Sequence, residues 1–540
     1  MIGTWQLIKL ILRRDRVKLP LWIIGFVGFL LYMIPMLRAT YGQPAGLNTI
    51  FNLFETMPSV LLLTGPMDTP TFGGLFTFET TLWWGLVLAF FNTLLVIRHT
   101  RANEENGSQE LILSGRVSRL APLSAVLIVA FAANLLIAVL TTGGMLALYG
   151  GWSFSSCALY GLAFGAFGFA WAAVAAVVAQ LVESARTANG ILAGLIGAAF
   201  LLRGLGDFTG TTSASGILQP AWISHLSPFG WLQATRSLTF PDWAPLLIPL
   251  IFAAGAVILA FVLLKQRDLS AGILPAHNGR GRASKFRRTA LGLTVYLQKN
   301  IFAGWLVGCL ALVGIVGMLA SNKMTAVYSS SDAAKTMIET MGGRGDFLAA
   351  FLTAMLKIAV IMVLAYTVQA IAKLRAEESS GHLENLLAAR LSRVGWAVRH
   401  SAVVLVGAAV MLAASGAILA LVANFSGHLG LNVGDYVLGA LSYWPLALAA
   451  VGVYILLFGV LPRAAGAVLW AIYGFVAFMS WLGPLMKIDQ RIIDLSPLTH
   501  FAAAPAEAVM AWPLIIAAVI AIALAIGGLV AWRQRNLIEQ

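Results

Sequence analysis

The sequence predicts an all-α polytopic membrane protein with about twelve transmembrane helices, and two observations lead to this prediction. The chain is 59% hydrophobic and only 11% charged, whereas soluble domains carry roughly 25% charged residues. Apolar runs also recur along the whole chain, and each can cross a hydrocarbon core about 30 Å thick, because a helix rises roughly 1.5 Å per residue. This pattern excludes an ordinary soluble globular protein.

The apolar runs fall into two sets of six. We expect the first six spans at residues 19–37, 80–98, 121–149, 152–180, 187–205 and 244–264. We expect the second six at residues 301–320, 347–371, 395–423, 434–461, 464–482 and 512–532. A Gly- and Arg-rich stretch between the sets is typical of a flexible linker. The expected domains are therefore a first half over 1–268, a cytoplasmic linker over 269–299 and a second half over 300–540.

The distribution of basic residues predicts the orientation of the spans. If the amino terminus is inside, 26 of the 35 Lys and Arg residues fall in cytoplasmic segments or at the cytoplasmic ends of spans, as expected when basic residues are retained on that side. We therefore expect a bacterial inner-membrane protein with both termini in the cytoplasm. Its net charge of +13 suits contact with anionic lipid head groups, so binding to nucleic acid is not needed to explain it.

The second span of each half is followed by a similar charged segment, and this similarity is the clearest sign of an internal repeat. Both copies hold arginine, acidic residues and glycine: Arg101, Glu104, Glu105, Gly107 and Glu110 in the first, and Arg375, Glu377, Glu378, Gly381 and Glu384 in the second. We expect one residue of slippage between the copies, so that the two sites are unequal. The closing Lys265-Gln266-Arg267 also resembles Arg533-Gln534-Arg535. These matches predict a parallel repeat of six plus six helices.

The chemistry of the repeated segment favours a docking element over a plain charged loop. Glycine permits a tight turn, and the residues after it alternate apolar and basic at helical spacing, which is typical of a short amphipathic helix at the membrane interface. A solvated loop that obeys the positive-inside rule is the alternative. Two copies favour a helix that presents its glutamates to a cytoplasmic partner, because complementary charges fix partner choice and register.

The repeated segments resemble the cytoplasmic coupling region of ABC-2 type exporter permeases, and two fused halves look like the subgroup that exports polyketide antibiotics such as tetronasin. The resemblance implies a type V exporter-like fold and export of hydrophobic or amphipathic compounds, as in multidrug efflux and antibiotic resistance. It also implies two copies of a separate ABC ATP-binding subunit, one on each coupling region. ATP and Mg would be bound by that partner, since this chain has no Gly-x-x-x-x-Gly-Lys-Ser/Thr loop and no cofactor of its own is expected.

A lysine inside a predicted span marks a candidate substrate pathway. Charged groups within a membrane are costly and usually face a cavity, so Lys357 is a functional candidate. The resemblance implies that the second and fifth helices of each half line the pathway, which here adds Trp83, Trp84, Asn92 and Trp481. Alternatively, Lys357 snorkels or pairs with a nearby acid, and the tryptophans form an interfacial belt.

Long outer segments at residues 38–79, 206–243 and 486–511 are predicted to contain short helices that dip back into the protein, where such pieces survive only when packed. The resemblance implies an outer gate there, at Ser227, Pro228, Ser496 and Pro497; a connecting loop is the alternative.

Other classes of protein remain as alternatives. An ion-coupled secondary transporter would place carboxylates in mid-membrane, where the spans contain almost none. A lipid- or polymer-exporting permease would share the architecture, and a membrane enzyme would gather polar groups at one face. The seven histidines lack metal-ligand spacing, so no metal site is expected.

Overall fold

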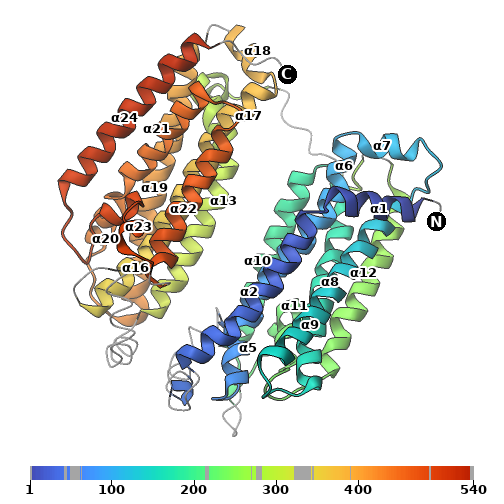
Figure 1. Ribbon diagram of the computed structural model, residues 1–540. Helices are drawn as coiled ribbons and strands as arrows, with labels where there is room; N and C mark the ends of the chain where they lie inside the picture. Colours follow the sequence, from blue (N-terminus) through green and yellow to red (C-terminus); the bar gives the residue numbers. More distant parts are fainter. Residues whose placement is uncertain are drawn as a thin grey trace. The chain divides into compact units, whose positions relative to one another are not determined.

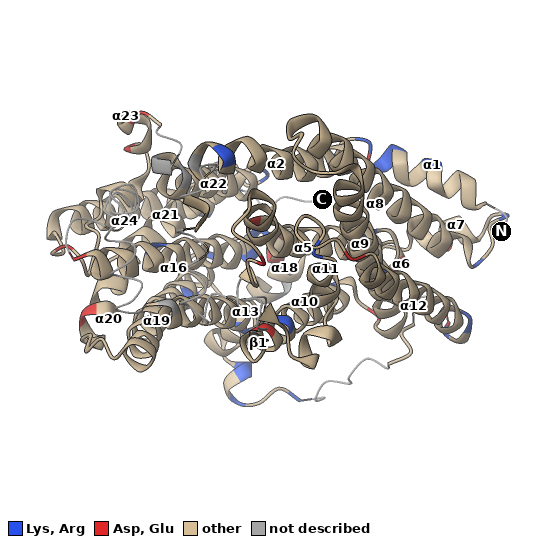
Figure 2. Cartoon of the chain, turned by 90° about the horizontal axis from the view of Figure 1, so that it is seen from below, with Lys and Arg blue, Asp and Glu red and all other residues tan. Residues whose placement is uncertain are grey.

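The computed structural model describes residues 3–41, 46–48, 51, 61, 64–212, 218–268, 271–274, 282–320, 342, 346–388, 391–485 and 488–535. Within these ranges the chain is almost entirely helical, and the strands described are β1 (Thr211–Thr212) and β2 (Leu218–Gln219), which pair antiparallel. The chain forms two compact units, Met1–Gly279 and Arg280–Gln540, each a bundle of long helices (Figure 1). Charged residues are sparse along these helices (Figure 2).

The first unit begins with α1 (Thr4–Arg14) and six membrane-length helices follow. They are α2 (Lys18–Tyr41), α5 (Phe72–His99), α8 (Ala121–Leu148), α9 (Phe154–Leu181), α10 (Ala185–Phe208) and α12 (Leu247–Gln266). Shorter helices connect them: α6 (Arg101–Glu105), α7 (Ser108–Leu113), η1 (Trp222–Leu226), α11 (Pro228–Ala234) and η2 (Ala244–Leu246).

The second unit starts at η3 (Phe286–Arg288). Its long helices are α13 (Ala290–Leu319), α16 (Phe347–Ile371), α19 (Arg393–Gly427), α21 (Trp444–Val460), α22 (Ala465–Leu485) and α24 (Ala511–Gln534). The shorter helices are α17 (Lys373–Ser379), α18 (His382–Ala388), α20 (Val433–Leu441), α23 (Gln490–Ile493) and η4 (Pro497–His500).

The structure confirms an all-α polytopic membrane protein. Eleven helices among the described residues are long and apolar enough to cross a membrane. The remaining predicted span, the eleventh at residues 464–482, falls on α22, which has 21 residues but a shorter described apolar stretch, Ala465–Trp481.

The predicted tenth span is confirmed as one membrane-length segment, Val433–Val460, and it contains a two-residue turn between α20 and α21 that the sequence did not predict. Proline stands in the first turn of α21, where its missing N–H is tolerated and its fixed φ favours a new helix start. The turn is held by Tyr443, whose hydroxyl donates to the carbonyl of Ala502 at 3.0 Å. The corresponding α9 of the first unit runs unbroken over 28 residues.

In both units the last span packs mainly against the fourth, α12 against α9 and α24 against α21. Small residues make this possible, because helices in lipid associate through close backbone packing. Ala170, Ala173 and Ala253 form the buried contact of the first pair. In the second pair, a Cβ on Gly452 would overlap the backbone of Ala521.

Candidate functional site

Each unit has an elbow after its second span. We define the first elbow as α6, the turn at Gly107 and α7, and the second elbow as α17, the turn at Gly381 and α18; each lies at one end of its bundle (Figure 1). Both glycines have φ of 72°, which L side chains rarely adopt. A Cβ would meet nothing within 4 Å at either position, so the backbone angle alone explains the glycine.

The two elbows align without the expected slippage. Arg101 and Arg375, Glu104 and Glu378, and Gly107 and Gly381 are each separated by 274 positions. The expected one-residue deletion is therefore not present, and the difference is a substitution, with asparagine at position 103 where the second copy has Glu377.

The first elbow is built around a buried arginine. Arg101 donates from Nη1 to the Glu104 carboxylate at 2.7 Å, from Nε to the carbonyl of Ala179 at 2.7 Å and from Nη2 to the carbonyl of Ala271 at 2.7 Å. The elbow is thereby fixed to the end of α9 and to the chain that follows α12.

A second arginine holds Glu104 from the end of the last span. Arg267, directly after α12, donates from Nη2 and Nη1 to the two Glu104 oxygens at 2.5 and 2.9 Å. Such two-point guanidinium–carboxylate pairs are among the strongest hydrogen bonds in proteins. Arg267 also donates to Gln180 at 2.8 Å, and Arg119 donates to the carbonyl of Arg267.

The second elbow repeats this arrangement. Arg375 donates to Glu378 at 3.1 Å, and Arg535, directly after α24, donates to the other Glu378 oxygen at 2.6 Å. Arg393 donates to the carbonyl of Arg535 at 2.8 Å. We call Arg101–Glu104–Arg267 the first clamp and Arg375–Glu378–Arg535 the second clamp.

The clamps change the expected role of three acids. Glu104, Glu377 and Glu378 are buried, so they do not form the surface that sequence reasoning expected to face a partner. Glu105, Glu110 and Glu384 are exposed. Glu105 also accepts from the backbone N–H of Ala185, the first residue of α10, at 2.9 Å.

Helix α1 supports the first elbow through an ion-pair cluster that sequence reasoning missed. Asp15 lies 2.9 Å from Arg98 and 2.5 Å from the ring of His99. Arg14 donates to Asn103 at 2.7 Å. The roles of Arg267 and Arg535 were missed as well, although their repeated tripeptides signalled that these positions correspond.

The candidate pathway residues of the first unit divide into two environments. Trp83 is 41% exposed and lies beside Phe200 of α10, while Trp84 packs against Phe29 of α2. Asn92 is fully buried and exchanges hydrogen bonds with Asn134 of α8 at 3.1 and 2.6 Å. It therefore joins two helices rather than facing an open path.

In the second unit, Lys357 interacts electrostatically with Glu507, which fits the alternative that it pairs with a nearby acid. Glu507 belongs to the segment between η4 and α24. This segment returns to α16, where the N–H of Ala506 donates to Thr353 at 3.2 Å. Trp481 is half-buried on α22, which packs against α16.

Both Ser-Pro pairs of the predicted outer gate begin short helices. Pro228 starts α11 and Pro497 starts η4. The preceding serines are buried and contact the fifth span of their unit: Ser227 donates to Ala199 at 2.7 Å, and Ser496 lies 2.8 Å from the hydroxyl of Ser480. The expected short helices are therefore present, and their role as a gate stays a prediction.

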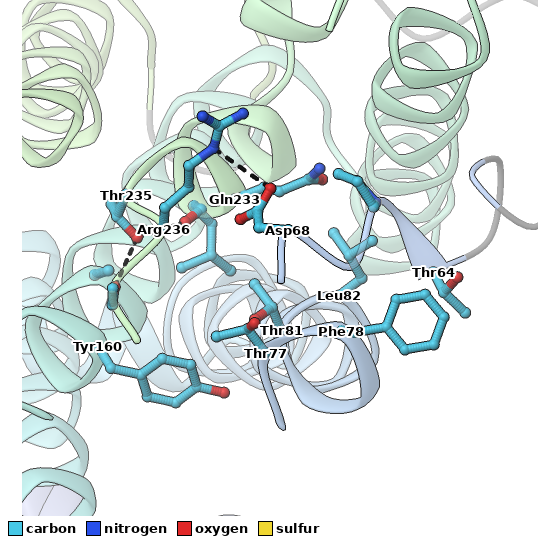
Figure 3. Close-up of a pocket in the computed structure, with 14 residues that line it drawn as sticks. Thr64, Asp68, Thr77, Phe78, Thr81, Leu82, Tyr160, Gln233, Thr235 and Arg236 are labelled. Carbon is cyan, nitrogen blue, oxygen red and sulfur yellow. Dashed lines mark hydrogen bonds and ion pairs between the residues drawn. The ribbon is translucent and has the colours of Figure 1, made fainter. Parts of the chain in front are cut away.

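A small polar pocket lies beside α11 (Figure 3). Asp68 and Arg236 face each other across it with 3.6 Å between Oδ1 and Nε. Burial raises the pKa of the Asp68 carboxyl, while the charge of Arg236 and a hydrogen bond from Thr239 oppose this shift. The space of about 30 Å³ in this pocket is enough for water. Asp68 and Arg236 also line a larger neighbouring pocket of about 500 Å³.

The described residues contain no group of three or more His, Cys, Asp or Glu side chains placed to hold a metal ion. Cys157 and Cys309 are both buried and free.

The fold defines a multi-pass membrane protein with an elbow after the second span of each unit. A family described as "Multidrug efflux system permease Rv1217c, C-terminal domain" matches residues 7–265 and 288–533. The multidrug efflux system permease protein Rv1217c of Mycobacterium tuberculosis is 31% identical over 541 residues, which cover 99% of this chain and 95% of that protein. The chain therefore belongs to the Rv1217c family of multidrug efflux system permeases.

Proposed function

We propose that this chain is the membrane-spanning subunit of an ABC exporter that moves hydrophobic or amphipathic compounds out of the cell. Its similarity to the Rv1217c permease along almost the whole chain carries this proposal. The energy would come from ATP hydrolysed, with Mg, by a separate subunit. The membrane would be the bacterial inner membrane, with both termini and both elbows on the cytoplasmic side, where the basic residues concentrate.

The exposed parts of the elbows are the proposed docking sites for two copies of the ATP-binding subunit. On α7, Leu111 is 79% exposed beside the exposed Glu110, and on α18 the corresponding acid is Glu384. An exposed apolar side chain beside an acid suits an interface, because apolar contact supplies affinity while charge sets register. The buried clamp acids would act inside the elbow instead.

The two clamps also support the proposed six-plus-six repeat. The proposed membership of the tetronasin-like subgroup rests on the resemblance of the two fused halves alone. In this proposal substrates pass Trp83, Trp84, Lys357 and Trp481, and α11 and η4 belong to the outer gate. Rigid-body rocking of the helices would open the path outward when the partner subunits close on ATP.

Purification of the tagged chain from its native membrane tests the function. We expect an ATPase to co-purify, and we expect Glu110→Lys and Glu384→Lys together to release it, because like charges at an interface weaken binding. Asp435→Lys is the control, since this exposed acid lies at the start of α20, after α19 has crossed the unit away from the elbow. A chain that purifies alone and transports on an ion gradient would instead support the secondary-transporter alternative.

A further inference from the structure

The last spans are the least buried of the described membrane-length helices. Only 17% of the apolar window of α12 and 11% of that of α24 are buried inside the protein, against 67% and 61% for the second spans α5 and α16. Each last span packs mainly on the fourth span. Helix packing therefore gives the last spans little direct contact with the elbows.

The clamps supply that missing connection. Arg267 and Arg535 each stand one residue beyond the last span, and each binds the glutamate of an elbow that continues from the second span. We propose that Arg267 and Arg535 are positioning residues that transmit movement of the elbows to the last spans. This inference rests on the proposed function, because it assumes that a partner moves the elbows.

The geometry of the first clamp suits transmission. Arg267 holds both Glu104 oxygens at once, so the joint resists rotation as well as separation. The three side chains are 0%, 2% and 3% exposed, and salt screens such buried pairs much less than surface pairs. An elbow displaced by its partner would therefore pull the end of α12 with it.

The first clamp also fixes the start of the linker. The carbonyl of Ala271 accepts from Arg101 at 2.7 Å and from Arg267 at 2.9 Å. Two further backbone bonds join the linker to the end of α9, from Ile273 to Gln180 at 3.1 Å and from Leu274 to Leu181 at 2.9 Å. The hydrogen bonds around the Glu104 carboxylate thus connect the elbow to the ends of α9 and α12 and to the linker.

Cysteine labelling at the far ends of the last spans tests transmission without a known substrate. Trp243 and Trp512 are exposed at the beginnings of these spans. In complexes that carry Trp243→Cys or Trp512→Cys, ATP with vanadate should change the rate of maleimide labelling. Arg267→Gln should reduce this change about tenfold for Trp243→Cys, within the usual range of coupling between sites. Arg535→Gln should do so for Trp512→Cys.

Controls separate transmission from folding and from docking. Lys265→Gln and Arg533→Gln remove an exposed charge two residues before each clamp arginine and should leave the labelling change intact. Arg267→Lys and Arg535→Lys should restore part of it, since lysine keeps the charge but not the two-point geometry. The clamp variants should keep the co-purified ATPase and its rate of ATP hydrolysis.

Three outcomes would overturn the inference: an unchanged labelling response in the clamp variants, loss of the ATPase from them, or a response that falls only in proportion to their thermal stability. Absence of an ATPase from the wild-type preparation is a different result. It would overturn the proposed function, and with it the transmission role.

Discussion

The two elbows have the same connections but different surroundings. In the first clamp the side chains of Arg101 and Arg267 are 0% and 3% exposed, whereas those of Arg375 and Arg535 in the second are 24% and 15% exposed. Arg267 makes two bonds to its glutamate. Arg535 makes one, and its guanidinium lies over the ring of Phe458 at 5.1 Å.

Two similar sequence motifs can therefore contribute different amounts to the free energy of folding. Linker atoms cover the first clamp, since Ala271 accepts from both of its arginines. Attraction between charges strengthens as water is excluded, and so does the cost of leaving one charge unpaired. The first clamp should therefore be the more rigid of the two. The second clamp should break more easily when its elbow is displaced.

The largest expected effect comes from neutralising the clamp carboxylates. Glu104→Gln leaves two buried guanidinium groups without an anion and should lower the free energy of unfolding by about 3–5 kcal/mol. Glu378→Gln should cost about 1–3 kcal/mol, because the side chains of its two arginines are partly exposed. Unfolding in detergent, followed by tryptophan fluorescence, measures both, with the exposed Glu105→Gln as control. Equal losses at the two clamps would contradict the comparison.

A second pair of contacts also differs between the two units, in the position and sign of its charged residues. In the first unit Asp68 precedes the second span and pairs with Arg236 after α11, while in the second unit Lys357 lies within the second span and interacts with Glu507 after η4. Lys357→Met alone should lower the free energy of unfolding by about 2 kcal/mol, and Lys357→Met with Glu507→Gln should recover most of it, since the double change leaves neither charge without its counterpart. A double variant as unstable as the single one would show that the two residues act independently.

Smaller changes in the free energy of unfolding are expected for substitutions between the second and third spans of each unit. Asn92 and Asn134 bond each other in the first unit, whereas Tyr366 packs against Gly407 in the second. Asn92→Leu should cost about 0.6–1.7 kcal/mol, the usual range for such bonds between membrane helices. Tyr366→Phe keeps the ring and should therefore change the free energy of unfolding less than Asn92→Leu does. If the Asn92→Leu protein had wild-type stability but altered export, Asn92 would instead be a residue of the substrate pathway.

The smallest expected change in stability comes from Asp68, and it depends on pH. Burial raises the pKa of Asp68 in the folded protein, so folding favours its neutral form. Its contribution to stability is complete below the unfolded pKa and is lost as the pH rises through the folded pKa. Asp68→Asn should therefore stabilise the protein at pH 7 and make less difference at pH 4. Melting curves at both pH values check this, and the reverse order would mean that Arg236 outweighs burial.

Hydropathy predicted the fold because each span must satisfy its backbone internally and face lipid, which leaves a strong local pattern. The elbows were predicted because their residues lie close together in sequence. The partners of Glu104 and Glu378 were not, since Arg267 and Arg535 lie 163 and 157 residues away. The break between α20 and α21 was missed because it depends on a turn held by Tyr443 from a distant segment.

Site-specific cross-linking tests the central claim most directly. A photoreactive maleimide on Leu111→Cys, at the exposed face of α7, should join this chain to a separate ATP-binding subunit. The same probe on Leu438→Cys, exposed on α20, should not. An adduct from Leu111→Cys alone is the predicted result. No adduct from Leu111→Cys, or equal adducts from both positions, would contradict the account that the elbows are where an ATPase drives this permease.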